Sequence, residues 1–400
     1  MNANLSDLTV RLGTIAVFRK LLSDNVVEAL IEFLDSPCEN TEEKVGKYGN
    51  FVSKLYENTD NLSKYILNIV TNNENVFVKK IAHGEIVSEE LNRAVKSELE
   101  IFSEISSVTP EDLKSAIQGY SGFLPKWKTE RIDLENEYFS RCSEIGRFGY
   151  GIYSKYHMFN VKDGEIVPVK HPDPVTLKDL SGYKRERQAV IDNTKALLAG
   201  KPAANILLSG DAGTGKSSTV KAVANEFKGD GLRIIETRKD QLVDMPAVIE
   251  QLSVNPLKFI IFIDDLSFTN LSDNFNALKA ILEGSVSAKS KNVVIYATSN
   301  RRHIVKESFK ERDSSDDVHR NDTIQELMSL SERFGLCITF VKPSKECYLD
   351  IVRNIAGQSG LDTENEALYA EAERFALLKG GRSGRIARQF VESKLSEIDS

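Results

Sequence analysis

The amino-terminal part of the chain carries the hydrophobic periodicity of helices. In Phe51–Val70, apolar residues recur at spacings of three, four and seven, which predicts one amphipathic helix. Thr109–Asp112 predicts the start of another helix. Threonine is a favoured N-cap, proline fits the first helical position, and acidic residues stabilise the first turn.

Aromatic residues gather between Tyr120 and Phe159, around the only tryptophan, Trp127. They favour a packed core between helices over the alternative of a ligand cage. We therefore expect residues 1–155 to form an all-helical domain.

The pattern changes to β-type runs after the aromatic cluster. Met158–Val161 and Glu165–Val169 lie on either side of Asp163-Gly164, a strong hairpin signal. His171–Pro174 then reads His-Pro-Asp-Pro, which is stiff and has no helix propensity. We expect a β-hairpin and linker over 156–174, with the boundary of a new domain at its end.

From Asp192 onward, strands and helices alternate. The apolar runs are Ile206–Leu208, Leu232–Ile235, Phe259–Ile263, Val293–Tyr296 and Leu336–Val341. Runs separated by helical segments predict a parallel sheet covered on both faces. The expected fold class is therefore α/β, with a sheet core at 175–343.

Composition and charge narrow the class of protein. The chain of 400 residues is 41% hydrophobic and 28% charged, which matches globular proteins and excludes collagen-like and disordered classes. No apolar run approaches the roughly 20 residues that span a bilayer. The net charge of -7 disfavours non-specific binding to nucleic acid, whose affinity comes largely from neutralised phosphates.

Neither the start of the chain nor its cysteines indicates secretion. Met1–Leu22 carries charged residues among its apolar ones and lacks the apolar core of a signal peptide. The four cysteines include no Cys-x-x-Cys pair, which argues against a zinc site and a disulfide framework. We expect a cytoplasmic protein with reduced thiols.

A glycine-rich loop stands between the first core strand and the next helix. It matches the pattern Gly-x-x-x-x-Gly-Lys-[Ser/Thr] without a mismatch. Glycines let the backbone wrap around phosphates, so that successive N–H groups and the helix N-terminus face negative charge. We expect the nucleotide to be bound by Gly210, Asp211, Ala212, Gly213, Thr214, Gly215, Lys216, Ser217 and Ser218. Lys216 would neutralise the β and γ phosphates and Ser217 would hold Mg²⁺. The alternative is a plain glycine-rich turn with a capping lysine.

Two carboxylates follow the strand Phe259–Ile263, at the end where ligands of open α/β sheets bind. Asp264 is the candidate partner of Mg²⁺, together with Ser217. Asp265 is the candidate to polarise the attacking water. Alone the pattern is weak, because many strands end in acidic turns, but its position about fifty residues after the phosphate loop strengthens it.

Later segments resemble the AAA+ superfamily of oligomeric ATPases in their order. Tyr296–Arg301 is similar to the first sensor of that superfamily, a polar residue between the acidic pair and the γ-phosphate. The likeness implies this role for Asn300, with Thr298 next, and the alternative is a plain turn. Ser331–Leu336 resembles the Arg-Phe box of the bacterial replication initiator. It implies that Arg333 is an arginine finger for the neighbouring subunit's γ-phosphate, and the alternative is a surface salt bridge at a helix end.

Gly380–Arg388 resembles the second-sensor helix of the branch-migration helicase of Holliday junctions. The likeness implies a helical lid over 344–400, from which Arg385 contacts the nucleotide. Arg382 and Arg388 lie three residues to either side, so the three could share one helix face or form a solvated basic end.

The superfamily holds adenine beside the start of its core, which implies a base site near Leu180, Gly182 and Tyr183. Tyr183 could equally be ordinary hydrophobic filling. A GTPase is disfavoured, because no Asn-Lys-x-Asp guanine motif occurs and Thr237–Asp240 is only a partial match.

Over the whole chain, the likeness is to an uncharacterised bacterial family of predicted AAA-type ATPases, known only as a domain of unknown function. Asp264–Phe268, Ala297–His303 and Gly381–Arg385 carry it. The resemblance implies ATP and Mg²⁺ as ligands, hydrolysis of ATP, and a homo-oligomer that is a ring or part of one. It also implies remodelling or loading of an unidentified protein or nucleic-acid partner, gripped by the amino-terminal helices or the polar insertion Val305–Ile324. No membrane partner is expected.

One residue departs from the superfamily pattern. Most members have glutamate after the metal-binding aspartate, and this chain has Asp265. The shorter side chain favours the alternative function, an ATP-gated binding or assembly module with little turnover.

Overall fold

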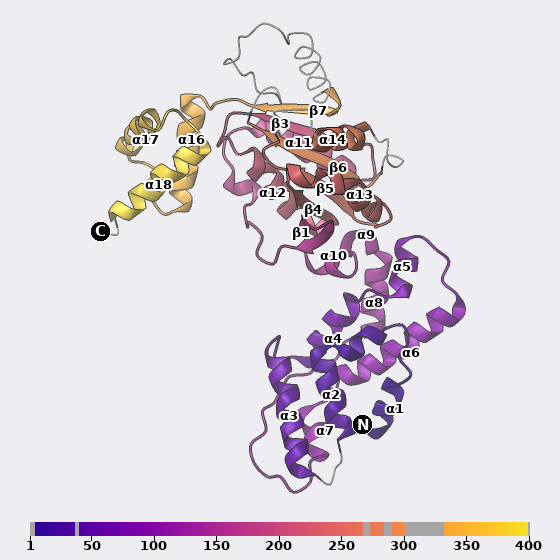
Figure 1. Cartoon of the computed structure of the whole chain (residues 1–400). Helices are drawn as coiled ribbons and strands as arrows, with labels where there is room; N and C mark the ends of the chain where they lie inside the picture. Colours follow the sequence, from indigo (N-terminus) through magenta and orange to yellow (C-terminus); the bar gives the residue numbers. More distant parts are fainter. Residues whose placement is uncertain (1–4, 37–39, 267–272, 284–289, 301–331, 399–400) are drawn as a thin grey trace. The chain divides into compact units, whose positions relative to one another are not determined.

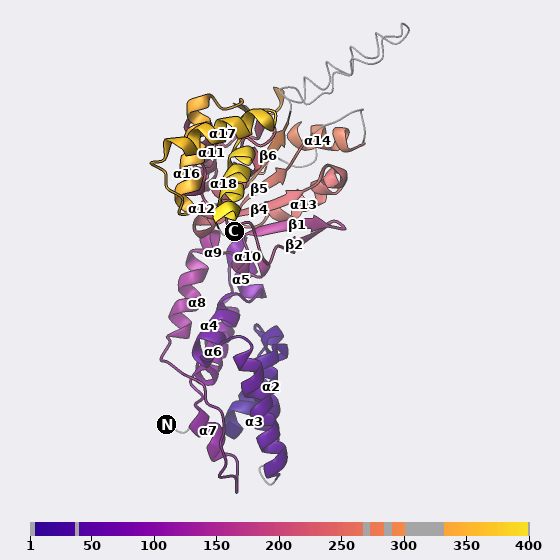
Figure 2. The same ribbon diagram turned by 90° about the vertical axis from the view of Figure 1, so that its left-hand side faces the viewer.

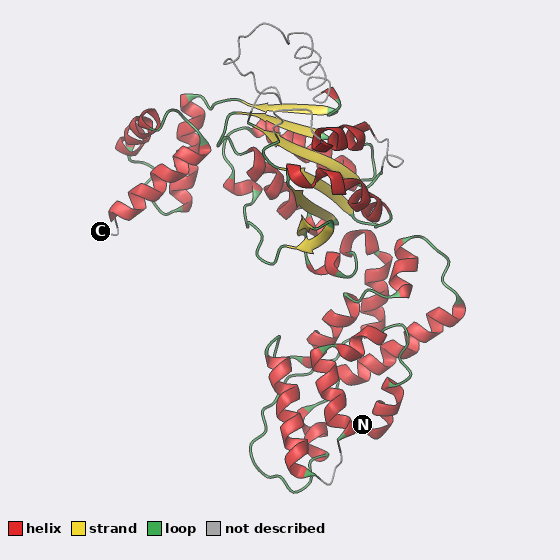
Figure 3. Ribbon diagram, viewed as in Figure 1, coloured by secondary structure: helices red, strands yellow, loops and turns green. Residues whose placement is uncertain are grey.

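The chain divides into two compact units, Met1–Lys155 and Tyr156–Ser400 (Figure 1). The computed structural model describes residues 5–36, 40–266, 273–283, 290–300 and 332–398. The first unit is helical, and the second is an α/β fold followed by three helices (Figure 3). Within those ranges, no helix is both long and apolar enough to cross a bilayer.

The first unit packs its helices around one hydrophobic core, which confirms the predicted helical amino-terminal part. Phe18, Phe33, Phe51 and Phe102 are among its fully buried side chains. The helices are α1 (Leu5–Leu12), the 3-10 turn η1 (Arg19–Ser23), α2 (Asn25–Asp35), α3 (Thr41–Tyr56), α4 (Leu62–Thr71), α5 (Val76–Ala82), α6 (Glu89–Ser106), α7 (Pro110–Ser115), α8 (Leu134–Ser143), α9 (Ile145–Phe148) and α10 (Ile152–Lys155).

The single helix predicted over Phe51–Val70 is wrong, because two helices occupy that range. α3 ends at Tyr56 and α4 begins at Leu62. Residues 58–61 read Asn-Thr-Asp-Asn, and such short polar side chains favour caps and turns over helix interiors. Asn61 caps α4 by accepting a hydrogen bond from a first-turn N–H at 3.0 Å. The apolar spacing continues across the break because both helices bury a face in the same core.

Two other predictions for this unit are confirmed. α7 begins at Pro110 with a capping box between Thr109 and Asp112. Trp127 is part of the packed core, since its ring lies 5.1 Å from that of Phe51, edge to face. Its indole N–H donates to a backbone carbonyl at 2.9 Å, as a buried tryptophan requires.

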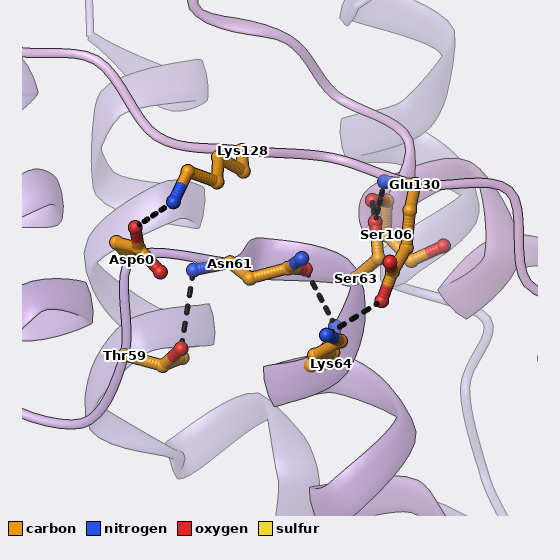
Figure 4. Close-up of polar contacts among 8 residues, drawn as sticks. All are labelled: Thr59, Asp60, Asn61, Ser63, Lys64, Ser106, Lys128 and Glu130. Carbon is orange, nitrogen blue, oxygen red and sulfur yellow. Dashed lines mark hydrogen bonds and ion pairs between the residues drawn. The ribbon is translucent and has the colours of Figure 1, made fainter.

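A loop segment crosses the first unit beside the start of α4 (Figure 4). Lys128 forms a parallel backbone bridge with Asn61. Next to it, the hydroxyl of Ser63 donates to the carbonyl of Ser106 at 2.7 Å and accepts the N–H of Glu130 at 2.9 Å. Ser63 is fully buried, so its two hydrogen bonds join the loop to two helices away from water.

Replacing Ser63 by alanine is expected to lower the free energy of unfolding by about 1–3 kcal/mol, because buried polar groups lose their partner. Denaturant unfolding followed by circular dichroism measures the change. Asp60→Asn is the control, since its ion pair with Lys128 is exposed and surface pairs contribute little. Equal losses in the two variants would contradict the expectation.

The second unit is built on a seven-stranded sheet in the order β2-β1-β4-β5-β6-β3-β7. The pair β1 and β2 is antiparallel, and all other neighbouring pairs are parallel. The strands are β1 (Met158–Lys162), β2 (Glu165–Pro168), β3 (Ile206–Gly210), β4 (Leu232–Thr237), β5 (Lys258–Ile263), β6 (Val293–Ser299) and β7 (Leu336–Phe340). The predicted α/β class is confirmed.

The hairpin of β1 and β2 belongs to this sheet. Asp163 and Gly164 both have positive φ, 52° and 77°, as the tight turn of a two-residue hairpin needs. Met158–Asn160 then pairs in parallel with Ile234–Glu236 of β4. The hairpin thus extends the sheet at one edge, and the second compact unit begins at Tyr156, before the hairpin, and not after residue 174 as expected from the sequence.

Helices cover the sheet and form the lid. Apolar residues of α11 and α12, among them Val190, Leu197 and Val223, pack on side chains of the central strands, and α13 and α14 lie on the opposite face (Figure 2). The helices of the core are α11 (Lys184–Leu198), α12 (Lys216–Glu226), α13 (Met245–Ser253) and α14 (Asp273–Glu283). The lid consists of α16 (Lys345–Gln358), α17 (Glu366–Leu378) and α18 (Gly384–Ile398), which share a separate apolar cluster around Tyr348 and Phe390.

Candidate functional site

The phosphate-loop residues connect the end of β3 to the first turn of α12. Gly210, Gly213 and Gly215 have φ of 131°, 76° and 90°, which side chains other than glycine rarely adopt. A Cβ at Gly210 would also lie 2.0 Å from the carbonyl oxygen of Phe340. The glycines are therefore required for the path of the loop, which leaves the N-terminus of α12 facing into it.

Lys216 is buried at the base of this loop, with 5% of its surface exposed. Its ammonium group donates to the carbonyls of Gly210 at 2.9 Å and Asp211 at 2.8 Å, and to Oδ1 of Asn300 at 3.2 Å. Burial lowers the pKa of this ammonium, and the nearby aspartate charges oppose that shift. A partly desolvated cation is thus held where a phosphate would approach.

The acidic residues follow β5 and face the loop. Oδ1 of Asp264 accepts the hydroxyls of Ser217 at 2.6 Å and Thr298 at 2.5 Å. Asp265 has a left-handed backbone, with φ of 53°, and its Oδ1 accepts the side-chain N–H of Asn300 at 2.7 Å. Asn300 therefore contacts both Lys216 and Asp265. The strands β3, β5 and β6 thus bring these predicted residues together at their carboxyl ends.

The lid touches the same loop through the start of α18. The N–H of Arg385 donates to the carbonyl of Gly213 at 3.3 Å, and a Cβ at Gly213 would lie 3.1 Å from Ser383 Oγ and from Arg385 Cβ. The positive charge of Arg385 is one of the smaller causes that lower the pKa of Lys216, after burial. The structure therefore brings Arg385 to the loop.

Arg382 and Arg385 do not share one helix face. α18 begins at Gly384, and Arg382 precedes it. The Arg382 guanidinium makes a bidentate ion pair with Glu373 of α17, at 2.9 and 2.8 Å. Arg382 thus holds two parts of the lid together.

Arg333 lies away from the phosphate loop of its own chain. It precedes β7, whose Leu336 pairs with Ile206 and whose Phe340 pairs with Gly210. Arg333 is therefore at the amino end of the strands, and the loop is at the carboxyl end. Its guanidinium forms an ion pair with Glu283 at 2.6 Å. No sequence pattern indicates Glu283 as the partner of Arg333, because only the fold brings the two residues together.

Tyr183 packs and hydrogen-bonds within the core. Its hydroxyl donates to the carbonyl of Val341 at 2.6 Å, and its ring lies 5.1 Å from that of Phe340. Gly182 has φ of 68°, and a Cβ there would lie 2.7 Å from Sγ of Cys347 in α16. The segment expected beside the base thus lies between the sheet and the lid.

Parts of the quoted motifs fall outside the described residues. They are Ser267, Phe268, Arg301–His303, Ser331 and the insertion Val305–Ile324.

The residues present fit a triphosphate with its metal. A buried lysine and a glycine loop at a helix N-terminus suit phosphate oxygens. The hydroxyl of Ser217 and the carboxylate of Asp264 are hard oxygen donors 2.6 Å apart, and Mg²⁺ is commonly bound by one or two carboxylates beside the phosphates.

The strand order, the glycine loop after β3 and the acidic pair after β5 together give the second unit the α/β fold of P-loop proteins. The chain belongs to the family described as "Protein of unknown function (DUF815)", whose sequence profile matches residues 154–398.

Solved structures similar to this chain include the RuvB Holliday junction branch migration motor of Thermotoga maritima. That match has 15% identity and a TM-score of 0.34, and covers 55% of this chain and 72% of the other. A point mutant of the same RuvB matches with 16% identity and a TM-score of 0.40, covering 57% and 67%. C. elegans PCH-2 matches with 17% identity and a TM-score of 0.36, covering 53% and 63%.

Gly213→Ala is expected to lower the free energy of unfolding by about 1–3 kcal/mol, because alanine is strained at this φ and its methyl group would crowd the start of α18. Thermal unfolding measures it. The control is Gly229→Ala, whose added Cβ meets nothing within 4 Å and whose φ is not in the left-handed region. A variant as stable as wild type would contradict both the left-handed backbone at Gly213 and its close contact with the start of α18.

Proposed function

We propose that this chain binds ATP with Mg²⁺ and hydrolyses it as one subunit of a homo-oligomer. The observation that carries the proposal is the continuous set of contacts from Lys216 through Asn300 to Asp265, with Ser217 and Asp264 beside it. Each of these groups has the chemistry that a triphosphate, its metal or an attacking water needs. A structural glycine turn would have no use for the acidic pair.

The phosphate loop and Lys216 would bind the triphosphate. The loop N–H groups would receive phosphate oxygens, and the ammonium of Lys216 would exchange its carbonyl acceptors for the β and γ phosphates. Ser217 and Asp264 would hold the metal. When bound there, Mg²⁺ would neutralise charge on the two terminal phosphates.

Asp265 would orient the attacking water. Asn300 would hold the Asp265 carboxylate, and through it the water, in position. Asp265 is exposed, so water reaches its carboxylate. Asn300 holds one oxygen of that carboxylate, which leaves the other to accept a proton from water. Arg385 would add positive charge from the lid, where developing negative charge on the phosphates needs it.

Arg333 would complete the site of a neighbouring subunit. It lies at the amino ends of the strands, opposite the phosphate loop, and therefore cannot act in the site of its own chain. An arginine supplied from outside is a recurring device for stabilising charge during phosphoryl transfer. The ion pair with Glu283 would hold the guanidinium until a neighbour's phosphates compete for it. The partner moved by this hydrolysis is a protein or nucleic acid that the amino-terminal unit would grip.

Steady-state phosphate release at several protein concentrations tests the proposal. Wild-type turnover should rise with concentration, and Lys216→Ala should abolish it with loss of binding to a fluorescent ATP analogue. Arg333→Ala should keep that binding and lower turnover by about 10³-fold or more. Arg353→Ala is the control, an exposed arginine paired with Asp350 within α16, and should behave as wild type.

Mixing Lys216→Ala with Arg333→Ala makes this test sharper. If Arg333 acts on a neighbour, random co-assembly restores about a quarter of the competent interfaces, so the mixture should exceed either variant alone. Phosphate release that is independent of concentration and survives in Lys216→Ala would refute the proposal.

A second candidate function is an ATP-gated assembly module with little turnover. Asp265 favours it, because the carboxylate is shorter than glutamate and already engaged by Asn300. In that case ATP would change the oligomeric state without phosphate release.

Asp265→Asn separates the two candidates. For an ATPase, the substitution should lower turnover about 10²–10⁴-fold, because the amide cannot accept a proton from water. The dissociation constant of the ATP analogue, measured by fluorescence titration, should change little. For the assembly module, wild type itself would show only background release while ATP shifts its sedimentation, and Asp265→Asn would match it.

A further inference from the structure

The hydroxyl of Thr298 lies between the two acidic residues of the site. It donates to Oδ1 of Asp264 at 2.5 Å and accepts the backbone N–H of Asp265 at 2.9 Å. The carbonyl of the same threonine accepts the N–H of Leu266 at 2.7 Å. One residue of β6 thus anchors three consecutive residues that follow β5.

Thr298 is not placed to contact a phosphate itself. Only 2% of its surface is exposed, and the single proton of its hydroxyl is committed to Asp264. Asn300, two residues further on, is exposed and reaches Lys216. Of the two residues weighed for the role of phosphate sensor, only Asn300 therefore faces the space where phosphate would bind.

The hydrogen bonds of Thr298 hold a strained part of the backbone. Asp265 has φ of 53°, a left-handed conformation that costs a residue with a Cβ free energy. Such a residue persists only where surrounding contacts determine it. The N–H of Asp265 itself is bonded to the Thr298 hydroxyl, so this bond holds the strained residue directly to β6.

The same hydroxyl also fixes the direction of Asp264. One oxygen of that carboxylate receives hydrogen bonds from Thr298 and Ser217 together. Two donors on one oxygen restrict rotation of the carboxylate and hold it beside the hydroxyl of Ser217. Groups that orient a metal-binding carboxylate in this way affect metal affinity without touching the metal.

We propose that Thr298 is a positioning residue for the metal-binding carboxylate of Asp264 and for the water-orienting carboxylate of Asp265. The inference rests on the proposed function and deepens it. Valine has the shape of threonine without the hydroxyl, so Thr298→Val removes both hydrogen bonds and keeps the volume. Thr298→Ser keeps the hydroxyl.

The test uses the full chain and two readouts, phosphate release and binding of a fluorescent ATP analogue, each titrated with Mg²⁺. Thr298→Val should raise the half-saturating Mg²⁺ concentration about 10–100-fold and lower kcat, as loss of a group that orients a metal ligand does. Binding of the analogue in EDTA, which depends on the loop and Lys216, should stay unchanged. Thr298→Ser should restore most of the Mg²⁺ response.

Thr237→Val is the matched control. Thr237 is also a buried threonine at the carboxyl end of a strand, and its hydroxyl faces the carbonyl of Arg238 and not the acidic pair. This variant should show the wild-type Mg²⁺ response. A shift as large as that of Thr298→Val would reduce Thr298 to a general packing residue and overturn the proposal, as would equal defects in Thr298→Val and Thr298→Ser.

The crystal structure of Thr298→Val separates this proposal from the proposed function. Asp265 should leave the left-handed region and the Asp264 side chain should rotate. An unchanged acidic turn would overturn the positioning role even if wild type hydrolyses ATP. A changed turn would support it even if wild type releases no phosphate, an outcome that would count against the proposed function alone.

Discussion

The buried ammonium group of Lys216 constrains the whole site. A cation removed from water needs acceptors in fixed positions, because an uncompensated buried charge is strongly unfavourable. Two carbonyls of the loop and the amide oxygen of Asn300 supply them. The loop can follow its path only because its glycines adopt backbone conformations that other residues avoid. The glycines and the lysine are therefore parts of one arrangement, and the position of Asn300 at the end of β6 completes it.

From that cation, contacts continue to both acidic residues. Asn300 joins Lys216 to Asp265, and Ser217 joins the start of α12 to Asp264. The groups that we assign to a triphosphate and its metal are thus already hydrogen-bonded to one another within the chain. Binding at such a site exchanges one set of hydrogen bonds for another, so the affinity is a difference between two well-satisfied states. This favours a ligand of high and localised charge over a weakly polar one.

Much of this arrangement could be predicted from the sequence, and the reasons differ between its parts. The five core strands and the phosphate loop are encoded locally, by apolar runs and a fixed glycine spacing, so they could be placed without knowledge of the fold. Hydrophobic spacing does not predict the break between α3 and α4, because it reports only which face is buried; the turn chemistry of residues 58–61 carries that signal.

The joining of the hairpin to β4 and the pairing of Arg333 with Glu283 could not be predicted, because both depend on residues far apart in the chain. The sequence position of Thr298 is compatible with a sensor, but its burial and its bonds to Asp264 and Asp265 appear only in three dimensions.

The opposite positions of Arg333 and the phosphate loop on the sheet have a consequence for symmetry. If each subunit offers an arginine at the amino ends of its strands and its phosphate loop receives a neighbour's arginine at the carboxyl ends, the two contacting surfaces differ. A two-fold dimer buries the same patch twice and cannot satisfy both, whereas head-to-tail contacts either close into a cycle or continue as an open series. In an open series, the last subunit would hold a site that lacks a donor, so the number of complete sites would always be one fewer than the number of chains.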